Sequence, residues 1–330
     1  MTLPTSVEGV PESGRTRSVG IGRAHAKAIL LGEHAVVYGA PALALPIPQL
    51  TVTASAAWSS RTSDSAGALS FTMTGSPSRA LVTQASDGLR RLTEEFLARM
   101  GVGGGAHFDV ILDGTIPPGR GLGSSAASSR AIAFALADLF GRELTPGEAF
   151  ALVQTAENMA HGRASGVDAV AVGAARPLLF QGGESRDLGI GCEGLFIIAD
   201  SGVAGSTKEA VAMLGERFGH RPGARERFVG RARELTEAGA ADLAGGRAAQ
   251  LGARLTDYHE LMRAAGLSTG AIDELVRAAL GAGSLGAKIT GGGLGGCLIA
   301  LTGPQHAREV TRRLHEAGAV QTWVLPLKGA

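Results

Sequence analysis

Hydrophobic and polar residues alternate along residues 50–58 and 106–113, and this period of two predicts half-buried strands. Residues 18–31 also have the character of a strand, and they lead into a polar turn. Phe71 and Met73 suggest a partner strand for residues 50–58. The first third of the chain is therefore expected to contribute most of one sheet.

Other stretches in the first half repeat their apolar side chains at helical spacing. They are residues 78–100 and the alanine-rich run 126–140. A capping box formed by Thr145 and Glu148, with proline at the first helical position, predicts a further helix to about residue 160. Strands and helices thus alternate in this half.

The second half has a different order of elements. Residues 182–193 are polar and rich in glycine, which makes them the best candidate for a domain boundary. The helices expected beyond them are residues 206–217, 224–240, 244–265 and 270–281, with a last helix from Pro304. The strands expected there are residues 194–200, 285–290, 296–302 and 319–326. This order predicts helices on one face of a small sheet.

We therefore predict an α+β chain of two domains. The expected parts are a mobile tail over residues 1–18, an N-terminal domain over residues 19–188 and a C-terminal domain over residues 189–330. A chain of 330 residues exceeds the size at which one hydrophobic core usually suffices.

Composition narrows the class of protein. The formal net charge is +1, so no overall field attracts nucleic acid or an acidic membrane, and neither is expected as a partner. Cys192 and Cys297 are the only cysteines and lack metal-binding spacing, which fits a reducing cytoplasm. The first 18 residues have no apolar core of a signal peptide, and no run reaches the roughly 18 apolar residues that span a bilayer. We expect a cytoplasmic protein.

The segment from Pro117 to Ala127, PPGRGLGSSAA, is the most informative in the chain. It joins the strand predicted at 106–113 to the helix predicted at 126–140. A glycine-dense turn that enters a helix brings free backbone N–H groups and the positive end of the helix dipole to one point, which suits a phosphate. The common P-loop is excluded, because two serines stand where GxxxxGK[ST] requires Lys.

If this turn holds ATP, phosphoryl transfer also needs a metal ion on the phosphates. Mg²⁺ usually takes few protein ligands, typically hydroxyl and carboxylate oxygens. Ser124 and Ser125 can supply the hydroxyl, and Glu157 is the candidate carboxylate. The alternative for Glu157 is a solvated carboxylate on the outside of its helix.

Phosphoryl transfer further needs a group that orients the attacking hydroxyl and a positive charge near the transferred phosphate. Asp168 follows a loop expected at residues 161–167 and is the only charge in its run of small apolar residues. It could instead cap a helix or a turn. Lys27 is a solitary charge in the strand predicted at 18–31, and its alternative is a lysine on an edge strand.

A third glycine-rich segment, KITGGGLGGC, covers residues 288–297. Glycine is too dense there for an ordinary strand, so either the backbone closely approaches a ligand or the segment is a glycine-filled contact between domains. Among the eight histidines, His34 lies in the segment that is densest in isolated polar residues, so it is a possible substrate contact.

Together these segments resemble the GHMP small-molecule kinases, and they are most similar to the mevalonate kinase branch of that family. The resemblance extends over roughly residues 20–330. The motifs that carry it are residues 27–44 (KAILLGEHAVVYGAPALA), 117–127, 157–168 with the SGVDA sequence that follows Ala164, 200–208 and 288–297.

The resemblance implies an N-terminal domain similar to ribosomal protein S5, a ferredoxin-like C-terminal domain, and ATP and mevalonate as substrates with Mg²⁺. The implied catalytic residues are Asp168 and Lys27, and the implied metal ligands are Ser125 and Glu157. The implied ATP-binding residues are Pro117, Pro118, Gly119, Arg120, Gly121, Leu122, Gly123, Ser124, Ser125 and Ala126. The implied substrate contacts are Lys27, Glu33, His34, Asp168, Thr290 and Gly291. A homodimer is possible.

The sequence departs from the family pattern at three places, and other functions stay open. His25 and Ala164 replace residues that shape turns, and Leu294 interrupts the third glycine run and adds bulk on the substrate side. A phosphomevalonate kinase or another alcohol kinase of the family is one alternative. A non-catalytic nucleotide sensor is another, although none of the implied catalytic groups is missing. A dinucleotide-binding oxidoreductase is disfavoured, because this sequence has no acidic residue at the right distance after its glycines to contact the ribose.

Overall fold

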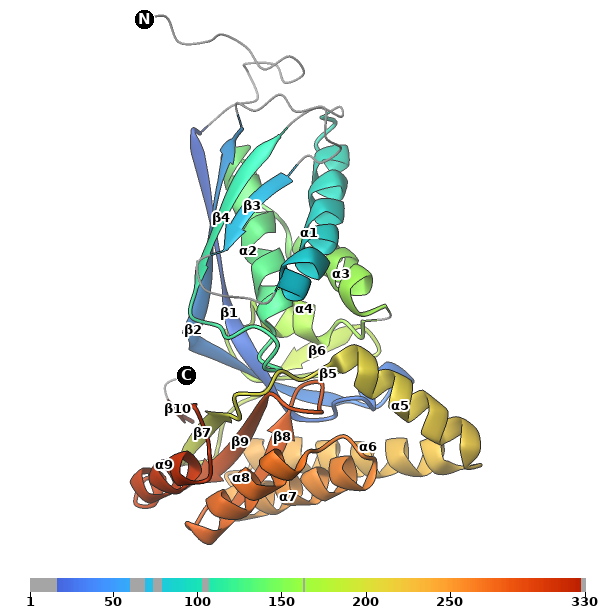
Figure 1. The fold of residues 1–330 in the computed structure, drawn as a ribbon, viewed down its shortest axis with the longest axis vertical. Coiled ribbons are helices and arrows are strands. Elements are labelled where there is room, and N and C mark those ends of the chain that lie inside the picture. Colours follow the sequence, from blue (N-terminus) through green and yellow to red (C-terminus); the bar gives the residue numbers. More distant parts are fainter. Residues whose placement is uncertain (1–16, 60–68, 74–78, 103–106, 163, 328–330) are drawn as a thin grey trace, which may run out of the picture. The chain divides into compact units, whose positions relative to one another are not determined.

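The computed structural model describes residues 17–59, 69–73, 79–102, 107–162 and 164–327 (Figure 1). The tail predicted over residues 1–18 lies outside the described residues, apart from its last two positions. The chain divides into two units, each assembled from separate segments. The first unit contains residues 1–25, 49–116 and 125–173, and the second contains residues 26–48, 117–124 and 174–330. The domain boundary predicted between residues 188 and 189 stays a prediction.

The sheet of the first unit is built around β4 (Phe108–Gly114). β4 is antiparallel to β2 (Ala42–Trp58), with Val52 opposite Gly114, and parallel to β3 (Leu69–Met73). β1 (Val19–Leu31) also pairs with β2. The prediction that Phe71 and Met73 belong to a direct partner of residues 50–58 is wrong. A helix connects β3 to the next strand in sequence, and this crossover makes β3 a parallel neighbour of β4 instead.

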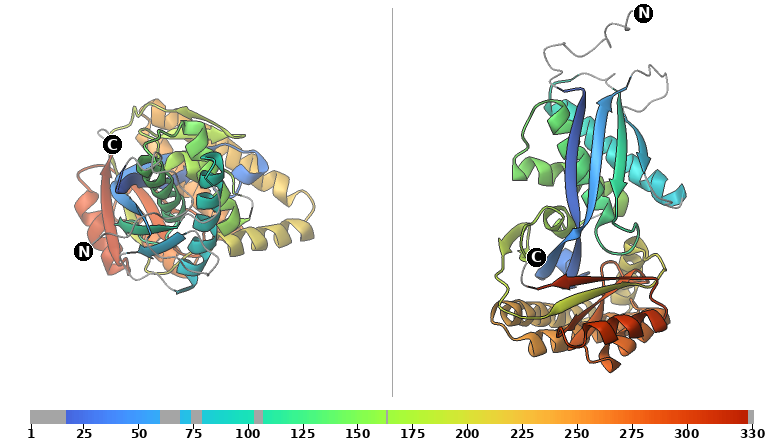
Figure 2. Two further views of the ribbon diagram at one scale, coloured as in Figure 1. Left: turned by 90° about the horizontal axis from the view of Figure 1, so that it is seen from above. Right: turned by 90° about the vertical axis from the view of Figure 1, so that its left-hand side faces the viewer.

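Helices cover one face of this sheet (Figure 2). They are α1 (Arg79–Arg99), α2 (Ser124–Leu139) and α3 (Pro146–His161), followed by the short α4 (Val167–Ala171). The predicted capping box of α3 is confirmed, because Thr145 Oγ1 accepts from Glu148 N and Glu148 Oε2 accepts from Thr145 N. Between the helices and the sheet lies a core that includes the ring cluster of Trp58, Phe108 and Phe140.

The second unit contains a hairpin that the sequence did not predict. β5 (Leu178–Gln181) and β6 (Glu184–Asp187) are antiparallel, and Gly182 and Gly183 between them have positive φ. β5 also pairs with the first residues of β2, with Phe180 opposite Ala42. Part of the glycine-rich stretch at residues 182–193 is therefore ordered as a strand.

The main sheet of the second unit has four antiparallel strands in the order β10-β7-β9-β8. Their bounds are Leu195–Asp200 (β7), Gly286–Thr290 (β8), Cys297–Thr302 (β9) and Gln321–Pro326 (β10). Each strand lies within about two residues of its predicted position. β7 and β9 are central, and Asp200 at the end of β7 is opposite Cys297 at the start of β9.

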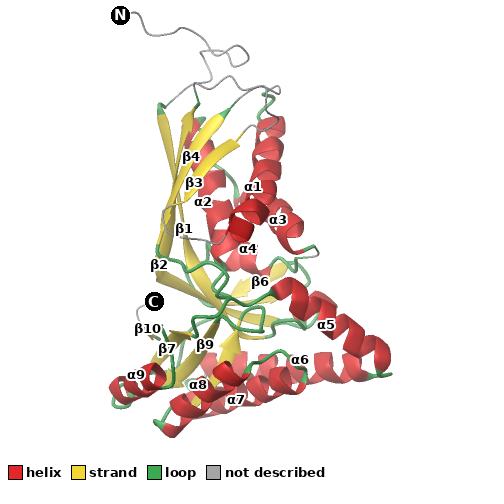
Figure 3. Cartoon of the chain, in the orientation of Figure 1, coloured by secondary structure: helices red, strands yellow, loops and turns green. Residues whose placement is uncertain are grey.

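Helices lie on one side of this sheet, as Figure 3 shows. Those of the second unit are α5 (Thr207–His220), α6 (Ala224–Ala244), α7 (Ala248–Ala264), α8 (Gly270–Gly281) and α9 (Ala307–Glu316). α7, α8 and α9 pack against the strands, and α6 packs against α7. The predicted arrangement of helices on one face is confirmed.

Across the ranges that the structure describes, no helix combines the length and the apolar character that crossing a lipid bilayer would require.

Candidate active site

The loop before α2, residues 117–124, has glycine at every second position of its centre. Gly119, Gly121 and Gly123 have φ of 70°, 77° and 74°, in the left-handed region that favours glycine. Arg120 and Leu122 between them have negative φ. A backbone that alternates in this way turns successive N–H groups toward one side and forms a concavity that binds anions.

Four consecutive carbonyl groups of this loop accept hydrogen bonds from other segments of the second unit. The pairs are Gly119 O with Gly205 N (2.9 Å), Arg120 O with Cys297 N (3.2 Å), Gly121 O with Lys27 Nζ (3.3 Å) and Leu122 O with Lys27 N (3.1 Å). In the described part of the chain, no backbone N–H of residues 119–123 donates a hydrogen bond. The carbonyls therefore hold the loop in shape, and the N–H groups are left for a ligand.

α2 begins at Ser124, the last residue of this loop. Its first N–H groups have no acceptor within the helix, and the helix dipole adds positive potential at the same end. The predicted glycine-rich turn before a helix is therefore present, and phosphate binding there stays a prediction.

The third glycine-rich segment contacts residues 117–124, which we call the phosphate loop, through main-chain atoms. A Cβ on Gly121 would lie 2.6 Å from Thr290 O, and one on Gly291 would lie 2.4 Å from Gly121 Cα. A Cβ on Gly296 would lie 2.9 Å from Arg120 O. Both glycine-rich segments belong to the second unit, so these are close contacts within one unit, and the two explanations that the sequence left open, a ligand or a contact between domains, stay predictions. A substrate contact of Gly291 stays a prediction.

Ser125 and Glu157 meet in the first unit, although they are far apart in sequence. Ser125 Oγ donates to Glu157 Oε1 at 2.6 Å, and Glu157 is only 4% exposed. Burial at this level excludes the alternative of a solvated carboxylate. A hydroxyl and a carboxylate are oxygen ligands of the kind that Mg²⁺ prefers, with phosphate oxygens and water completing its shell. Within the described residues no group of three or more His, Cys, Asp or Glu could hold a metal ion.

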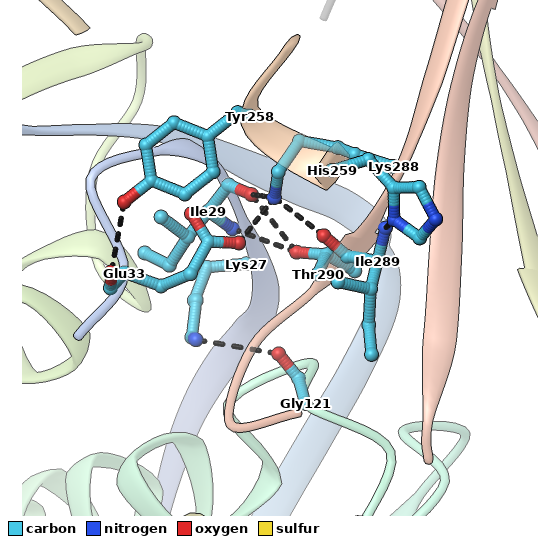
Figure 4. Close-up of polar contacts among 9 residues, drawn as sticks. All are labelled: Lys27, Ile29, Glu33, Gly121, Tyr258, His259, Lys288, Ile289 and Thr290. Carbon is cyan, nitrogen blue, oxygen red and sulfur yellow. Dashed lines mark hydrogen bonds and ion pairs between the residues drawn. The ribbon is translucent and has the colours of Figure 1, made fainter. Parts of the chain in front are cut away.

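Lys27 lies on β1 and is buried, with 2% exposure. The alternative of a solvent-reaching lysine on an edge strand is therefore excluded. Its Nζ donates to Gly121 O, so the side chain points to the phosphate loop, as Figure 4 shows.

Glu33, Tyr258 and Lys288 form a buried cluster, which we call the Glu33 cluster (Figure 4). Lys288 Nζ contacts Glu33 Oε1 as an ion pair and hydrogen bond, and it also donates to backbone carbonyls of Ile29 and Ile289. Tyr258 OH donates to Glu33 O at 2.8 Å, and its ring centroid lies 5.3 Å from Lys288 Nζ. Lys288 is thus completely buried, and Glu33 is almost completely buried.

Burial dominates the electrostatics of this cluster. It raises the pKa of Glu33 and lowers the pKa of Lys288, and the attraction between the two charges opposes both shifts. It also lowers the pKa of the neighbouring His34 to about 4, against a backbone hydrogen bond with Gly292. His34 is therefore neutral at pH 7.

Two polar atoms next to this cluster are available to a ligand. Among the described residues, Glu33 Oε2 and His34 Nε2 are buried without a hydrogen-bond partner. His34 also has a φ of 61°, a conformation that L-residues rarely adopt. Unpaired buried polar atoms and local strain are typical of functional sites.

Thr290 and Asp168 are placed as follows. Thr290 is buried, and its hydroxyl donates to Ile29 O and accepts from Ile29 N, so it joins β8 to β1. A substrate contact of Thr290 stays a prediction.

Asp168 lies in the first turn of α4, and Gly166 occupies the N-cap position instead. The alternative of an N-capping aspartate is excluded, and a catalytic role stays a prediction.

Sequence reasoning missed Lys288 and Tyr258. A signal was present for Lys288, because it is one of only four lysines in a chain that otherwise uses arginine. Tyr258 carries no such signal, since a tyrosine on a helix is usually part of the core.

Family models match both halves of the chain. The GHMP kinases N-terminal domain matches residues 85–175, and the GHMP kinases C-terminal domain matches residues 233–320. A mevalonate kinase from Thermococcus sibiricus is 33% identical over 90% of this chain and 93% of its own length. The chain therefore belongs to the GHMP kinase family. The resemblance and the α+β fold inferred from the sequence are confirmed.

Solved structures share the fold. A crystal structure of L. major mevalonate kinase in complex with R-mevalonate has a TM-score of 0.79 at 22% identity and covers 98% of this chain and 100% of that one. Streptococcus pneumoniae phosphomevalonate kinase in complex with phosphomevalonate and AMPPNP has a TM-score of 0.74 at 18% identity, with coverage of 92% and 99%. At these identities the likeness shows the fold and does not separate the two activities.

Proposed function

We propose that this chain phosphorylates the 5-hydroxyl of mevalonate with ATP and releases 5-phosphomevalonate and ADP. The observation that carries the proposal is the phosphate loop, in which four carbonyls accept hydrogen bonds and, within the described residues, the N–H groups of residues 119–123 donate none. The chain is also 33% identical to a mevalonate kinase over 90% of its length. The loop fits a polyphosphate, and the relative supplies the substrate class.

Each group of residues has a separate role in this proposal. The N–H groups of residues 119–123 and the start of α2 bind the phosphates of ATP. Ser125 and Glu157 would hold Mg²⁺, which neutralises charge on the phosphates when bound. Lys27, held against the phosphate loop, places its ammonium near the transferred phosphate.

Asp168 orients the attacking hydroxyl. The transition state of phosphoryl transfer is loose, so little proton removal is needed before the new bond forms. A well-placed carboxylate is then sufficient.

Glu33 and His34 bind the mevalonate. The free oxygen of Glu33 accepts a hydrogen bond from a hydroxyl group of the substrate, and Nε2 of neutral His34 is a second hydrogen-bonding atom, a donor to the substrate carboxylate when it carries the ring proton. Phosphomevalonate, the substrate of the alternative activity, would require additional basic groups. Lys288 does not supply one, because it is already paired with Glu33.

A coupled ADP-release assay with mevalonate, phosphomevalonate, galactose and homoserine tests the proposal. We expect turnover with mevalonate and at most traces with the other three. Turnover with phosphomevalonate alone would establish the alternative, and ATP binding without turnover of any substrate would favour a nucleotide sensor.

Asp168→Asn tests the assigned role of the carboxylate. We expect kcat to fall by about 10²–10⁴-fold, the usual contribution of a group that assists proton transfer, while ATP affinity is retained. A variant with wild-type kcat would remove Asp168 from the mechanism.

The remaining predictions from the sequence are part of the same proposal. They are a cytoplasmic location, no nucleic-acid or membrane partner, and a possible homodimer.

A further inference from the structure

Three loops of the second unit are joined at the phosphate-binding site. They are residues 117–124, residues 201–205 after β7, and residues 291–296 before β9. Gly205 N donates to Gly119 O, and Gly296 N donates to Val203 O at 2.7 Å. A Cβ on Gly205 would lie 2.6 Å from Gly293 O. The shape of the phosphate loop therefore depends on the segment that follows β7.

Arg120 is the one charged residue of the phosphate loop, and its side chain is directed at that segment. Its Nε lies 2.9 Å from Oδ1 and 3.0 Å from Oδ2 of Asp200, and its Nη2 donates to Gly202 O at 2.9 Å. The side chains of Arg120 and Asp200 are 19% and 7% exposed. This is a charge-assisted contact shielded from water, which is stronger than a typical surface ion pair.

The position of Asp200 is fixed by the sheet of the second unit. It ends the central strand β7, where it is opposite Cys297 of β9, and its backbone O accepts from Val320 N at 2.9 Å. Its Oδ1 also accepts from Gly202 N at 2.8 Å. The guanidinium of Arg120 is thus tied to the end of the sheet, while the backbone of Arg120 lies in the phosphate loop.

We propose that Arg120 and Asp200 are a positioning pair, which fixes the phosphate loop so that its N–H groups converge on the phosphates of ATP. The proposal rests on the proposed function in taking ATP as the ligand of this loop. Arg120 then acts through its contact with Asp200 and not by touching a phosphate itself. A phosphate-binding arginine would make the opposite prediction for Asp200, since removing the carboxylate would release Arg120 to the nucleotide.

The sign of the Asp200→Asn effect distinguishes these roles. Asparagine keeps an oxygen for Gly202 N and removes the charge that holds Arg120. We expect Arg120→Ala and Asp200→Asn each to weaken AMPPNP binding about 10-fold by calorimetry, which is about 1.4 kcal/mol. The double variant should bind no more weakly than either single variant, because both remove one interaction. In kinetics, KM for ATP should rise while KM for mevalonate is unchanged.

Unchanged or tighter AMPPNP binding by Asp200→Asn, together with weaker binding by Arg120→Ala, would overturn the proposal and make Arg120 a phosphate ligand. Arg247→Ala is the matched control. Its Nε contacts the equally buried carboxylate of Asp242 at 2.7 Å, but at the turn between α6 and α7. We expect it to affect stability and to leave nucleotide affinity unchanged.

A second readout does not depend on nucleotide. Hydrogen exchange of the backbone amides that donate to the loop, those of Gly205 and Cys297, should be about 10-fold faster in Arg120→Ala and Asp200→Asn than in wild type or Arg247→Ala. Equal exchange in all four proteins would overturn the positioning role. A wild-type protein that binds no nucleotide would contradict the proposed function, and the exchange measurement would still decide whether the pair fixes the loop.

Discussion

The phosphate loop and the Glu33 cluster lie in the same unit and are built in opposite ways. In the loop, main-chain contacts maintain the structure, because glycines allow close contact between segments and four carbonyls accept hydrogen bonds. In the Glu33 cluster, side chains make the contacts, because Lys288 pairs with one oxygen of the Glu33 carboxylate and Tyr258 donates to the backbone oxygen of Glu33. The loop should therefore be sensitive to added volume, and the cluster to charge and pH.

The largest effect is expected from Lys288→Met. Removing one partner of a buried ion pair leaves Glu33 as an uncompensated charge, which typically costs about 3–5 kcal/mol. Urea unfolding should show this loss, and the double variant Lys288→Met with Glu33→Leu should recover most of it, because it removes the orphaned charge as well. Lys208→Met is the control, since Lys208 is exposed on α5 and its loss should change stability by less than about 0.5 kcal/mol. A loss as small as this in Lys288→Met would show that the ion pair contributes little.

The next largest effect is a loss of folding stability at low pH, which arises from His34. The pKa of His34 is lowered from 6.5 to about 4 in the folded state, so in that interval the unfolded chain binds the proton more readily. The stability that depends on neutral His34 is complete above pH 6.5 and is lost as the pH falls through 4. At about 1.4 kcal/mol per pH unit, the loss approaches 3 kcal/mol.

His34→Asn isolates this contribution. Asparagine tolerates the left-handed backbone and does not titrate. The raised pKa of Glu33 acts in the opposite direction, because the folded state takes up that proton more readily, but it is present in both proteins. Unfolding free energies measured from pH 7 to 4 should therefore fall more steeply for wild type. Parallel curves would contradict the assignment of this loss to His34.

The same contrast explains what could be predicted from the sequence. The phosphate loop was predictable because its signal is local, since glycine spacing and the following helix are written in consecutive residues. The capping box of Thr145 and Glu148 is local in the same sense. The β5–β6 hairpin was missed, because all residues of Glu184–Asp187 are exposed and give no apolar alternation.

The contact between Glu33 and Lys288 joins residues 255 positions apart and depends on how β1 and β8 meet. No local pattern contains that information. Ser125 and Glu157 were proposed together as oxygen ligands of one metal ion; the structure shows the hydrogen bond between them, and metal binding stays a prediction. The burial of Glu157, which excluded its alternative, appeared only in the structure.

A smaller effect is expected from Gly121→Ala. Gly121 has a φ of 77°, and an added Cβ would lie 2.6 Å from Thr290 O. Gly182→Ala in the β5–β6 turn is the matched control, because it has a φ of 60° and no atom within 4 Å of the added Cβ. Gly121→Ala should lower kcat/KM for ATP about 10- to 100-fold, or about 1.4–2.7 kcal/mol, while Gly182→Ala should leave it unchanged. Equal effects of both variants would attribute the loss to backbone strain and not to contact between the loops.

The smallest effect should come from Tyr258→Phe, which separates the hydroxyl of the Glu33 cluster from its charges. The substitution removes the hydrogen bond to Glu33 O but keeps the ring beside Lys288. Glu33 O retains a second donor, Ala35 N at 2.7 Å, so no buried acceptor is left unpaired. The loss in urea unfolding should be about 1 kcal/mol, the usual net value of one hydrogen bond.

Tyr38→Phe is the natural control, because Tyr38 is the other tyrosine of the chain and is 37% exposed. It should show no measurable loss of stability. If Tyr258→Phe instead lost as much as Lys288→Met, the hydroxyl and the ion pair would form one cooperative unit. The side chains of the cluster could then not be treated as separate contributions, and the separation of hydroxyl from charges would not hold.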